Sequence, residues 1–210
     1  MKRPLIIIFL VLLIDQALKF WIKTNMYLGQ EFRIFGDWFI IHFTENNGMA
    51  FGMEFAGEFG KLFLSLFRIV ALIGIGWYMN TLVKEKAHPM LITSIALIFA
   101  GAMGNIIDST FYGMIFSSSE FQLAGLFPPE GGYSSFLHGK VVDMFYFPVW
   151  KGYFPEWMPL WGGEYFVFFR PVFNVADSSI SIGVALILLF QSVIFKQEKT
   201  AQNPIPVNEA

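Results

Sequence analysis

Two aspartates, Asp143 and Asp177, are the residues of this chain whose surroundings favour acid–base chemistry. Asp143 follows the apolar pair Val141-Val142, and Asp177 follows Val175-Ala176. A carboxylate in apolar surroundings is costly unless it has a partner. If the fold brings the two together at one face of a membrane, they share one proton and activate a water molecule for attack on a carbonyl group. A capping or structural role for each aspartate alone is the alternative.

The composition places this chemistry at a membrane. Of the 210 residues, 55% are hydrophobic and only 14% are charged, whereas a soluble domain has about 25% charged residues. The formal net charge of −2 gives no support for a nucleic-acid partner, and the absence of cysteine excludes a disulfide, a thiol nucleophile and a Cys-ligated metal. The three histidines form no metal-binding pattern, so we expect neither a metal nor another cofactor.

Four apolar segments are long enough to cross about 30 Å of hydrocarbon as helices. They cover approximately residues 4–22, 61–80, 89–108 and 178–195. Pro89 suits a helix start, and so do Asp177 and the two serines after it. We predict a single integral-membrane domain over residues 1–196, followed by a disordered polar tail over residues 197–210.

Basic residues predict the orientation of these spans. Six of them fall on one side of a four-span chain: Lys2, Arg3, Lys84, Lys86, Lys196 and Lys199. The positive-inside rule therefore places both termini in the cytoplasm and the two long connections, 23–60 and 109–177, outside.

The outer connections have different compositions along their length. Residues 31–43 are rich in β-forming residues and predict short strands. Residues 117–139 are rich in Ser, Gly and Pro and predict an irregular segment. Residues 144–170 are aromatic and contain three prolines, and we expect this segment to lie on the membrane surface.

Two charged residues, Asp15 and Lys19, lie inside the first predicted span. Their i, i+4 spacing, with the acid first, puts them on one helix face in the order that favours an ion pair. We expect a structural ion pair that orients the helix. In the alternative arrangement Lys19 reaches outward while Asp15 bonds to neighbouring helices.

The segment 44–52 contains Asn46 and Gly48 in a stretch of amide and glycine residues. This pattern is common in hairpin turns, and an amide that binds a peptide or a lipid headgroup is an equally good interpretation.

At the end of the third span, Asn105 and Asp108 share a helix face. Asp108 there opposes the helix macrodipole and needs a compensating partner.

Small residues before that point, Gly101 and Gly104, favour close contact between helices.

Together these motifs resemble the signal peptidase II family, over about residues 5–195 and in the family's order. The matching motifs are Asp15-Gln16-x-x-Lys19, Asn46-x-Gly48-x-Ala50-Phe51, Gly104-Asn105-x-x-Asp108, Val141-Val142-Asp143 and Phe173-Asn174-x-Ala176-Asp177-Ser178. Each motif is weak by itself, and five in order on a four-span chain are a specific signal.

The resemblance implies an all-α membrane protein. The expected fold is a four-transmembrane-helix bundle with a small extracytoplasmic β-cradle and a membrane-surface helix. It also implies a multi-pass location in the bacterial inner membrane and a catalytic pair formed by Asp143 and Asp177. Residues near the site that contact substrate are expected at Asn46, Gly48, Asn105, Asp108 and Asn174.

The implied substrate is a diacylglyceryl-modified prolipoprotein, cut before its lipidated cysteine. Membrane phospholipid is an expected partner, no nucleic acid is expected, and we expect a monomer. Two features depart from the family pattern. Ser109 stands where the family usually has an arginine, and the stretch 117–139 is longer than usual.

Two other functions compete with the peptidase. Intramembrane charges at Asp15, Lys19 and Asp108 are typical of a small proton-coupled transporter, although we find no inverted repeat. A non-catalytic scaffold for envelope proteins is the third hypothesis, and it predicts binding of lipoprotein precursors without cleavage.

Overall fold

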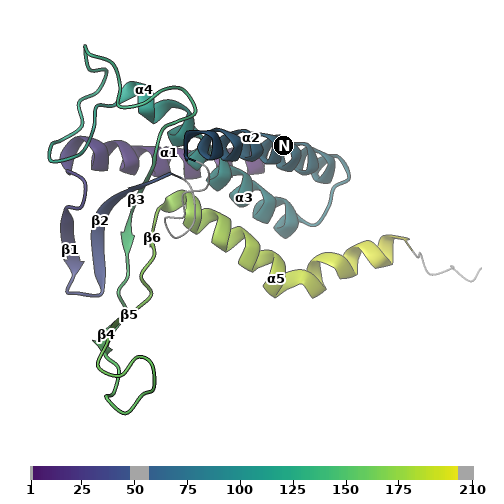
Figure 1. The fold of residues 1–210 in the computed structure, drawn as a ribbon. Coiled ribbons are helices and arrows are strands. Elements are labelled where there is room, and N and C mark those ends of the chain that lie inside the picture. The colour runs from purple at the N-terminus through teal and green to yellow at the C-terminus, as the bar shows by residue number, and fades with distance from the viewer. Residues whose placement is uncertain (1, 48–56, 203–210) are drawn as a thin grey trace, which may run out of the picture. The chain divides into compact units, whose positions relative to one another are not determined.

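The computed structural model of the chain describes residues 2–47 and 57–202 (Figure 1). Its long helices are α1 (Lys2–Asn25), α2 (Gly57–Lys84), α3 (Pro89–Ile107) and α5 (Val175–Gln202). All four are long and apolar enough to cross a membrane. Only 6% of the apolar stretch of α2 and 17% of that of α5 are buried inside the protein, a pattern typical of helices whose apolar surface faces lipid. Each of the four predicted spans coincides with one of these helices.

The helix ends differ from the sequence-based boundaries in two places. Helix α3 ends at Ile107 and the chain continues as a π-helical segment, η2 (Asp108–Tyr112), and a short helix, α4 (Gly113–Ile115). Helix α5 continues to Gln202 with a break in its helical dihedral angles at Phe190, so the prediction of a disordered tail is wrong for residues 197–202. Residues 203–210 lie outside the described part of the chain.

The chain divides into two compact units. The helical unit contains Met1–Gln16, Leu66–Ile106 and Val175–Ala210, and the sheet unit contains Ala17–Ser65 and Ile107–Asn174. Helices α1 and α2 contribute residues to both units.

Close packing of α3 against α5 characterises the helical unit. A Cβ atom on Gly101 would lie 2.2 Å from the Ala176 carbonyl oxygen, and one on Gly183 would lie 2.6 Å from the Ser94 carbonyl oxygen. The Ser179 hydroxyl donates a 2.8 Å hydrogen bond to the Leu97 carbonyl oxygen. The predicted packing role of Gly101 is thus confirmed, because small residues let two helix backbones approach closely.

The sheet unit contains two antiparallel sheets. The larger has the strand order β1 (Glu31–Phe35), β2 (Phe39–Asn46), β3 (Val141–Tyr146) and β6 (Val172–Phe173) (Figure 1). The smaller is the hairpin of β4 (Trp150–Tyr153) and β5 (Tyr165–Phe168). The predicted strands within residues 31–43 are confirmed, and the class all-α is too narrow for the chain.

The core of the sheet unit lies where α1, β2, β3 and the end of α3 meet. Its buried residues include Ile22, Phe43, Tyr112 and Val142. Phe20 makes edge-on ring contacts with Tyr112 and Phe116, and these two rings make a tilted contact with each other, with centroids 4.9–5.5 Å apart. This core fixes β3, which carries Asp143, against the C-terminal turns of α1.

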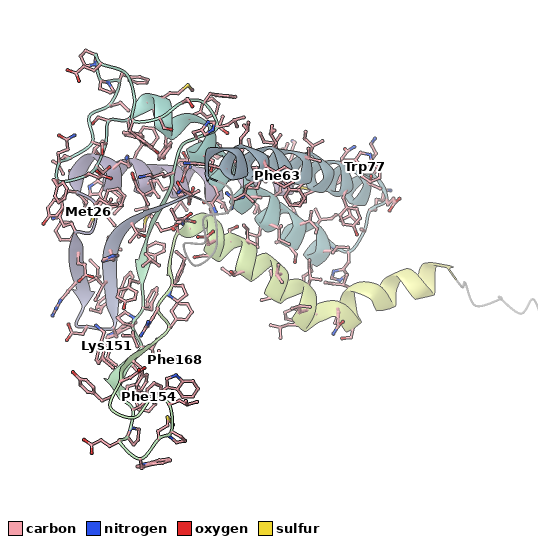
Figure 2. All side chains as sticks on the ribbon, viewed as in Figure 1. Met26, Phe63, Trp77, Lys151, Phe154 and Phe168 are labelled. Atoms are coloured by element: carbon pink, nitrogen blue, oxygen red, sulfur yellow. The ribbon has the colours of Figure 1, made fainter. Side chains whose placement is uncertain are left out.

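The segment 144–170 contains the β4–β5 hairpin, for which the sequence analysis predicted no strands. Figure 2 shows Lys151, Phe154 and Phe168 on it, and the Phe154 and Phe166 rings stack at 4.6 Å. Trp157 and Leu160 are 79% and 88% exposed, which agrees with a membrane-surface location, and that location stays a prediction. Apart from α4, no separate surface helix occurs within residues 2–47 and 57–202.

Candidate active site

Asp143 is a buried carboxylate whose direction is fixed by two side-chain amides. It lies on β3 opposite Thr44 of β2 and is only 3% exposed. Asn174 donates a 2.7 Å hydrogen bond to its Oδ1 atom, and Asn46 donates to its Oδ2 atom. The fully buried Asn174 amide also donates to the Val142 carbonyl oxygen at 3.2 Å. Amide donors stabilise the ionised carboxylate and hold it in one orientation.

A buried ion pair supports the backbone beside Asp143. Lys19 and Asp108 are both fully buried, and Lys19 Nζ lies 2.7 Å from Asp108 Oδ2. The same carboxylate oxygen accepts the Val142 N–H at 3.2 Å. Asp108 begins the π-helical segment η2, so it is not at a helix end as predicted. Its expected compensating partner is present, and that partner is Lys19.

A second buried lysine, which the sequence analysis missed, belongs to the same helix face. Lys23 Nζ lies 2.6 Å from Glu45 Oε1 and 2.7 Å from Ser119 Oγ. Lys23 follows Lys19 by four residues, so helical spacing is the signal that places both on one face. The contact joins α1 to β2 and to the segment 117–139.

Asp177 is the carboxylate of the helical unit and lies in the first turn of α5. The Asn105 amide of α3 donates a 2.8 Å hydrogen bond to its Oδ1 atom. The Arg68 guanidinium of α2 attracts it electrostatically. The first turn of a helix also favours a negative charge. Asp177 is therefore held from two neighbouring helices, as Asp143 is held from two segments of the sheet unit.

Asp15 fixes the start of the helix that carries Asp177. Its Oδ1 atom accepts the backbone N–H of Ala176 at 2.9 Å, one of the donors that a helix start leaves without an intrahelical partner. Gln16 donates to Asp15 Oδ2 at 3.1 Å and to the Gly104 carbonyl oxygen at 3.3 Å. A Cβ on Gly104 would lie 2.8 Å from Asp15 Oδ2, so glycine leaves the room that this carboxylate occupies.

The predicted site residues therefore fall into two groups. In the sheet unit, Asn46 and Asn174 donate hydrogen bonds to Asp143, and the Lys19–Asp108 pair holds the neighbouring Val142 N–H. Asn105 and Asp15 hold Asp177 and its helix in the helical unit. Gly48 lies outside the described residues, and Ser109 is buried within η2. Within residues 2–47 and 57–202, no group of three or more His, Asp or Glu side chains has the arrangement of a metal site.

Comparisons with known proteins agree on one family. The family model for signal peptidase (SPase) II matches residues 7–193. A lipoprotein signal peptidase of Porphyromonas gingivalis is 55% identical over 184 residues, which cover 87% of this chain and 80% of that protein. A lipoprotein signal peptidase of Amoebophilus asiaticus is 39% identical over 191 residues, which cover 90% of this chain and 77% of that protein.

Two solved structures, each described as a bacterial membrane enzyme determined by the in meso method, share the fold. One has a TM-score of 0.58 at 23% identity and covers 100% of this chain and 96% of its own. The other has a TM-score of 0.60 at 26% identity, with coverages of 91% and 93%. A multi-pass membrane peptidase is the class that these likenesses and the four apolar helices define. The chain belongs to the signal peptidase II family.

Proposed function

We propose that this chain is an aspartic endopeptidase that removes signal peptides from diacylglyceryl-modified prolipoproteins. It cuts before the lipidated cysteine and uses Asp143 and Asp177 as its catalytic pair. Two relatives named lipoprotein signal peptidase, at 55% and 39% identity, support the substrate class.

One contact carries the proposal that the two carboxylates act together. Asn174 is hydrogen-bonded to Asp143, and Asp177 follows Asn174 by only three residues. Three trans peptide units span at most about 11 Å between Cα atoms. The chain itself therefore limits how far Asp177 can lie from the residue that holds Asp143.

The proposed mechanism uses the pair as acid and base. Two neighbouring carboxylates do not both ionise cheaply, so they share one proton. The ionised member takes a proton from water, and the resulting hydroxide attacks the scissile carbonyl carbon. The protonated member polarises the carbonyl oxygen and then protonates the leaving amine, which restores the starting state. The amides of Asn46, Asn105 and Asn174 keep both carboxylates aimed at this water.

The membrane positions the substrate in this proposal. The acyl chains and the signal helix stay in lipid beside a four-helix bundle, and the cleavage site reaches the outer interface. The larger sheet forms an extracytoplasmic cradle there, and both termini lie in the cytoplasm, as the basic residues predict. Tethering in two dimensions supplies much of the orientation that catalysis requires. Phospholipid surrounds a monomeric enzyme.

The test compares Asp143→Asn, Asp177→Asn and the double variant in detergent with a lipidated substrate. We expect each single variant to lose nearly all turnover and the double variant to be little worse, because the pair acts as one unit. Glu156→Gln removes an exposed carboxylate of the sheet unit and serves as the control with full activity. Substantial turnover by either single Asp variant refutes the pair.

A further inference from the structure

A polar hollow lies within the sheet unit, on the segment that is longer than the family pattern. Its volume of about 560 Å³ is within the range of ligand pockets, roughly 300–1,000 Å³. Residues 117–140 supply most of the wall, and α2 contributes one lysine. The polar lining includes Lys61, Lys140, His138, Ser117, Ser118 and Ser134.

The wall of this hollow is tied to the core of the unit. Lys23 of α1 bonds to Ser119 at 2.7 Å, and its ammonium group lies 4.8 Å from the centre of the Tyr133 ring. The Tyr133 hydroxyl accepts the backbone N–H of Lys140 at 2.7 Å, and the Tyr133 N–H donates to the Phe116 carbonyl oxygen at 3.0 Å. The hollow is therefore shaped before a ligand arrives, which lowers the entropic cost of binding.

Two residues that line the hollow, Lys61 and Lys140, are linked to Asp143. Lys61 Nζ donates a 3.0 Å hydrogen bond to Asn47, and the preceding residue, Asn46, donates to Asp143. Lys140, which also lines the hollow, immediately precedes β3 and lies three residues before Asp143. Three peptide units span at most about 11 Å, so a short peptide that begins at the carboxylate reaches the hollow.

The charges of the hollow differ in exposure. Lys61 and Lys140 are partly buried, whereas Glu120 and Glu130 are exposed. Lys140 Nζ lies 3.7 Å from Glu45 Oε2, a looser contact than the 2.6 Å between Glu45 and Lys23. Water and salt screen exposed charges more than partly buried ones. The inner wall therefore attracts acidic groups despite the acidic residues of the rim.

We propose that this hollow binds the first residues of the mature lipoprotein, just after the lipidated cysteine, and favours acidic side chains there. The inference rests on the proposed function. In that reaction the signal helix and the acyl chains stay in lipid, so the mature segment is the part of the substrate that enters water. A polar, basic-walled hollow close to Asp143 matches the location and the chemistry of that segment.

The experiment measures kcat and KM with three synthetic diacylglyceryl-modified peptides. They differ only in the second and third residues after the cysteine, which are Asp-Asp, Ser-Ser or Lys-Lys. We expect the Asp-Asp peptide to form two partly exposed ion pairs, with Lys61 and Lys140. Its KM should therefore be about five- to tenfold below that of the Lys-Lys peptide. The Ser-Ser value lies between them, and kcat is similar for all three. High salt reduces the difference.

Matched variants locate the effect. Lys61→Gln and Lys140→Gln each reduce the preference for Asp-Asp over Lys-Lys, and Lys140→Arg retains it because the charge is kept. Lys151→Gln removes the same charge from an exposed site on β4, outside the hollow, and leaves the preference unchanged.

The outcomes separate the two proposals. Equal KM values for all three peptides, or an equal loss of preference in the Lys140→Gln and Lys151→Gln variants, overturn the role of the hollow and leave the peptidase intact. A wild-type protein that cuts none of the three peptides contradicts the proposed function and this inference together.

Discussion

The Asn174 side-chain amide donates a 2.7 Å hydrogen bond to Asp143, and Asn174 is the last residue before helix α5. The contact ties the end of β6 to the middle of β3, and the covalent chain then leads directly to Asp177. In the proposed mechanism Asn174 positions Asp143 through this hydrogen bond, and it limits the place of Asp177 through the short stretch of chain between them. Its side chain is fully buried, so its loss is not repaired by water from outside.

Replacing Asn174 with alanine tests this positioning role. We expect kcat to fall about 100-fold with a small change in KM, because a misplacement of about 1 Å near the reacting groups has an effect of that size. Asn25→Ala, at the exposed end of α1, is the matched control. Kinetics with a lipidated peptide provide the measurement, and an Asn174→Ala enzyme with wild-type kcat contradicts the role.

Replacing only one member of the Lys19–Asp108 pair should destabilise the protein more than replacing both members. Lys19→Met leaves a buried carboxylate without its ammonium partner, at a cost of about 3–5 kcal/mol. The double variant Lys19→Met with Asp108→Asn keeps a polar group for the Val142 N–H and leaves no unpaired charge. Denaturant unfolding in detergent should therefore find the double variant more stable than Lys19→Met alone. The reverse order contradicts a tight ion pair.

The contact between α3 and α5 makes Gly101 a sensitive position. Gly101→Ala places a methyl group 2.2 Å from the Ala176 carbonyl oxygen, and overpacking of this kind costs about 1–3 kcal/mol. Activity should fall as well, because Asp177 follows Ala176. Gly74→Ala, at a helical glycine with open space around it, is the control and should be neutral or slightly stabilising. Equal thermal stability of the two variants contradicts the close packing.

The pKa of Tyr133 predicts a loss of stability at alkaline pH. Burial raises the pKa of this hydroxyl above its ordinary value of 10.0, and the hydrogen bond from the Lys140 backbone lowers it by less. Above about pH 10 the unfolded chain loses the proton that the folded protein keeps, so the free energy of unfolding decreases as pH rises. Tyr133→Phe should lack this component. If the free energy of unfolding fell with the same slope above pH 10 in both proteins, burial would not raise the pKa of Tyr133.

Hydropathy and residue type predicted the spans and the first two strands, because each depends on local composition. Twenty apolar residues indicate a membrane helix, and the β-forming stretch 31–43 became β1 and the start of β2. The π-helical turn at Asp108–Tyr112 was not predicted, since one extra residue in a helical turn leaves no periodic signal. The β4–β5 hairpin was missed because its strands are short, and exposed and partly buried positions do not alternate along them.

For the candidate site too, some features were predictable from the sequence and others were not. Apolar surroundings singled out Asp143 and Asp177, and the resemblance added the three asparagines. Each asparagine amide donates a hydrogen bond to one of the two carboxylates. The i, i+4 spacing placed Asp15 and Lys19 on one helix face. It did not identify Asp108 as a partner of Lys19, because spacing along one helix carries no information about which residues of other segments pack against it. The role of Asp15 at the start of α5 depends on a backbone N–H, which no side-chain pattern reveals.

The separation of the Asp143 and Asp177 carboxylates in an experimental structure in lipid tests the account most directly. Direct hydrogen bonding places the nearest oxygens about 2.5–3.0 Å apart, and one bridging water places them about 4.5–5.5 Å apart. We expect a distance in one of these two ranges. Carboxylates too far apart for a single water to bridge, in a protein that still cleaves lipidated substrate, would contradict the proposed mechanism.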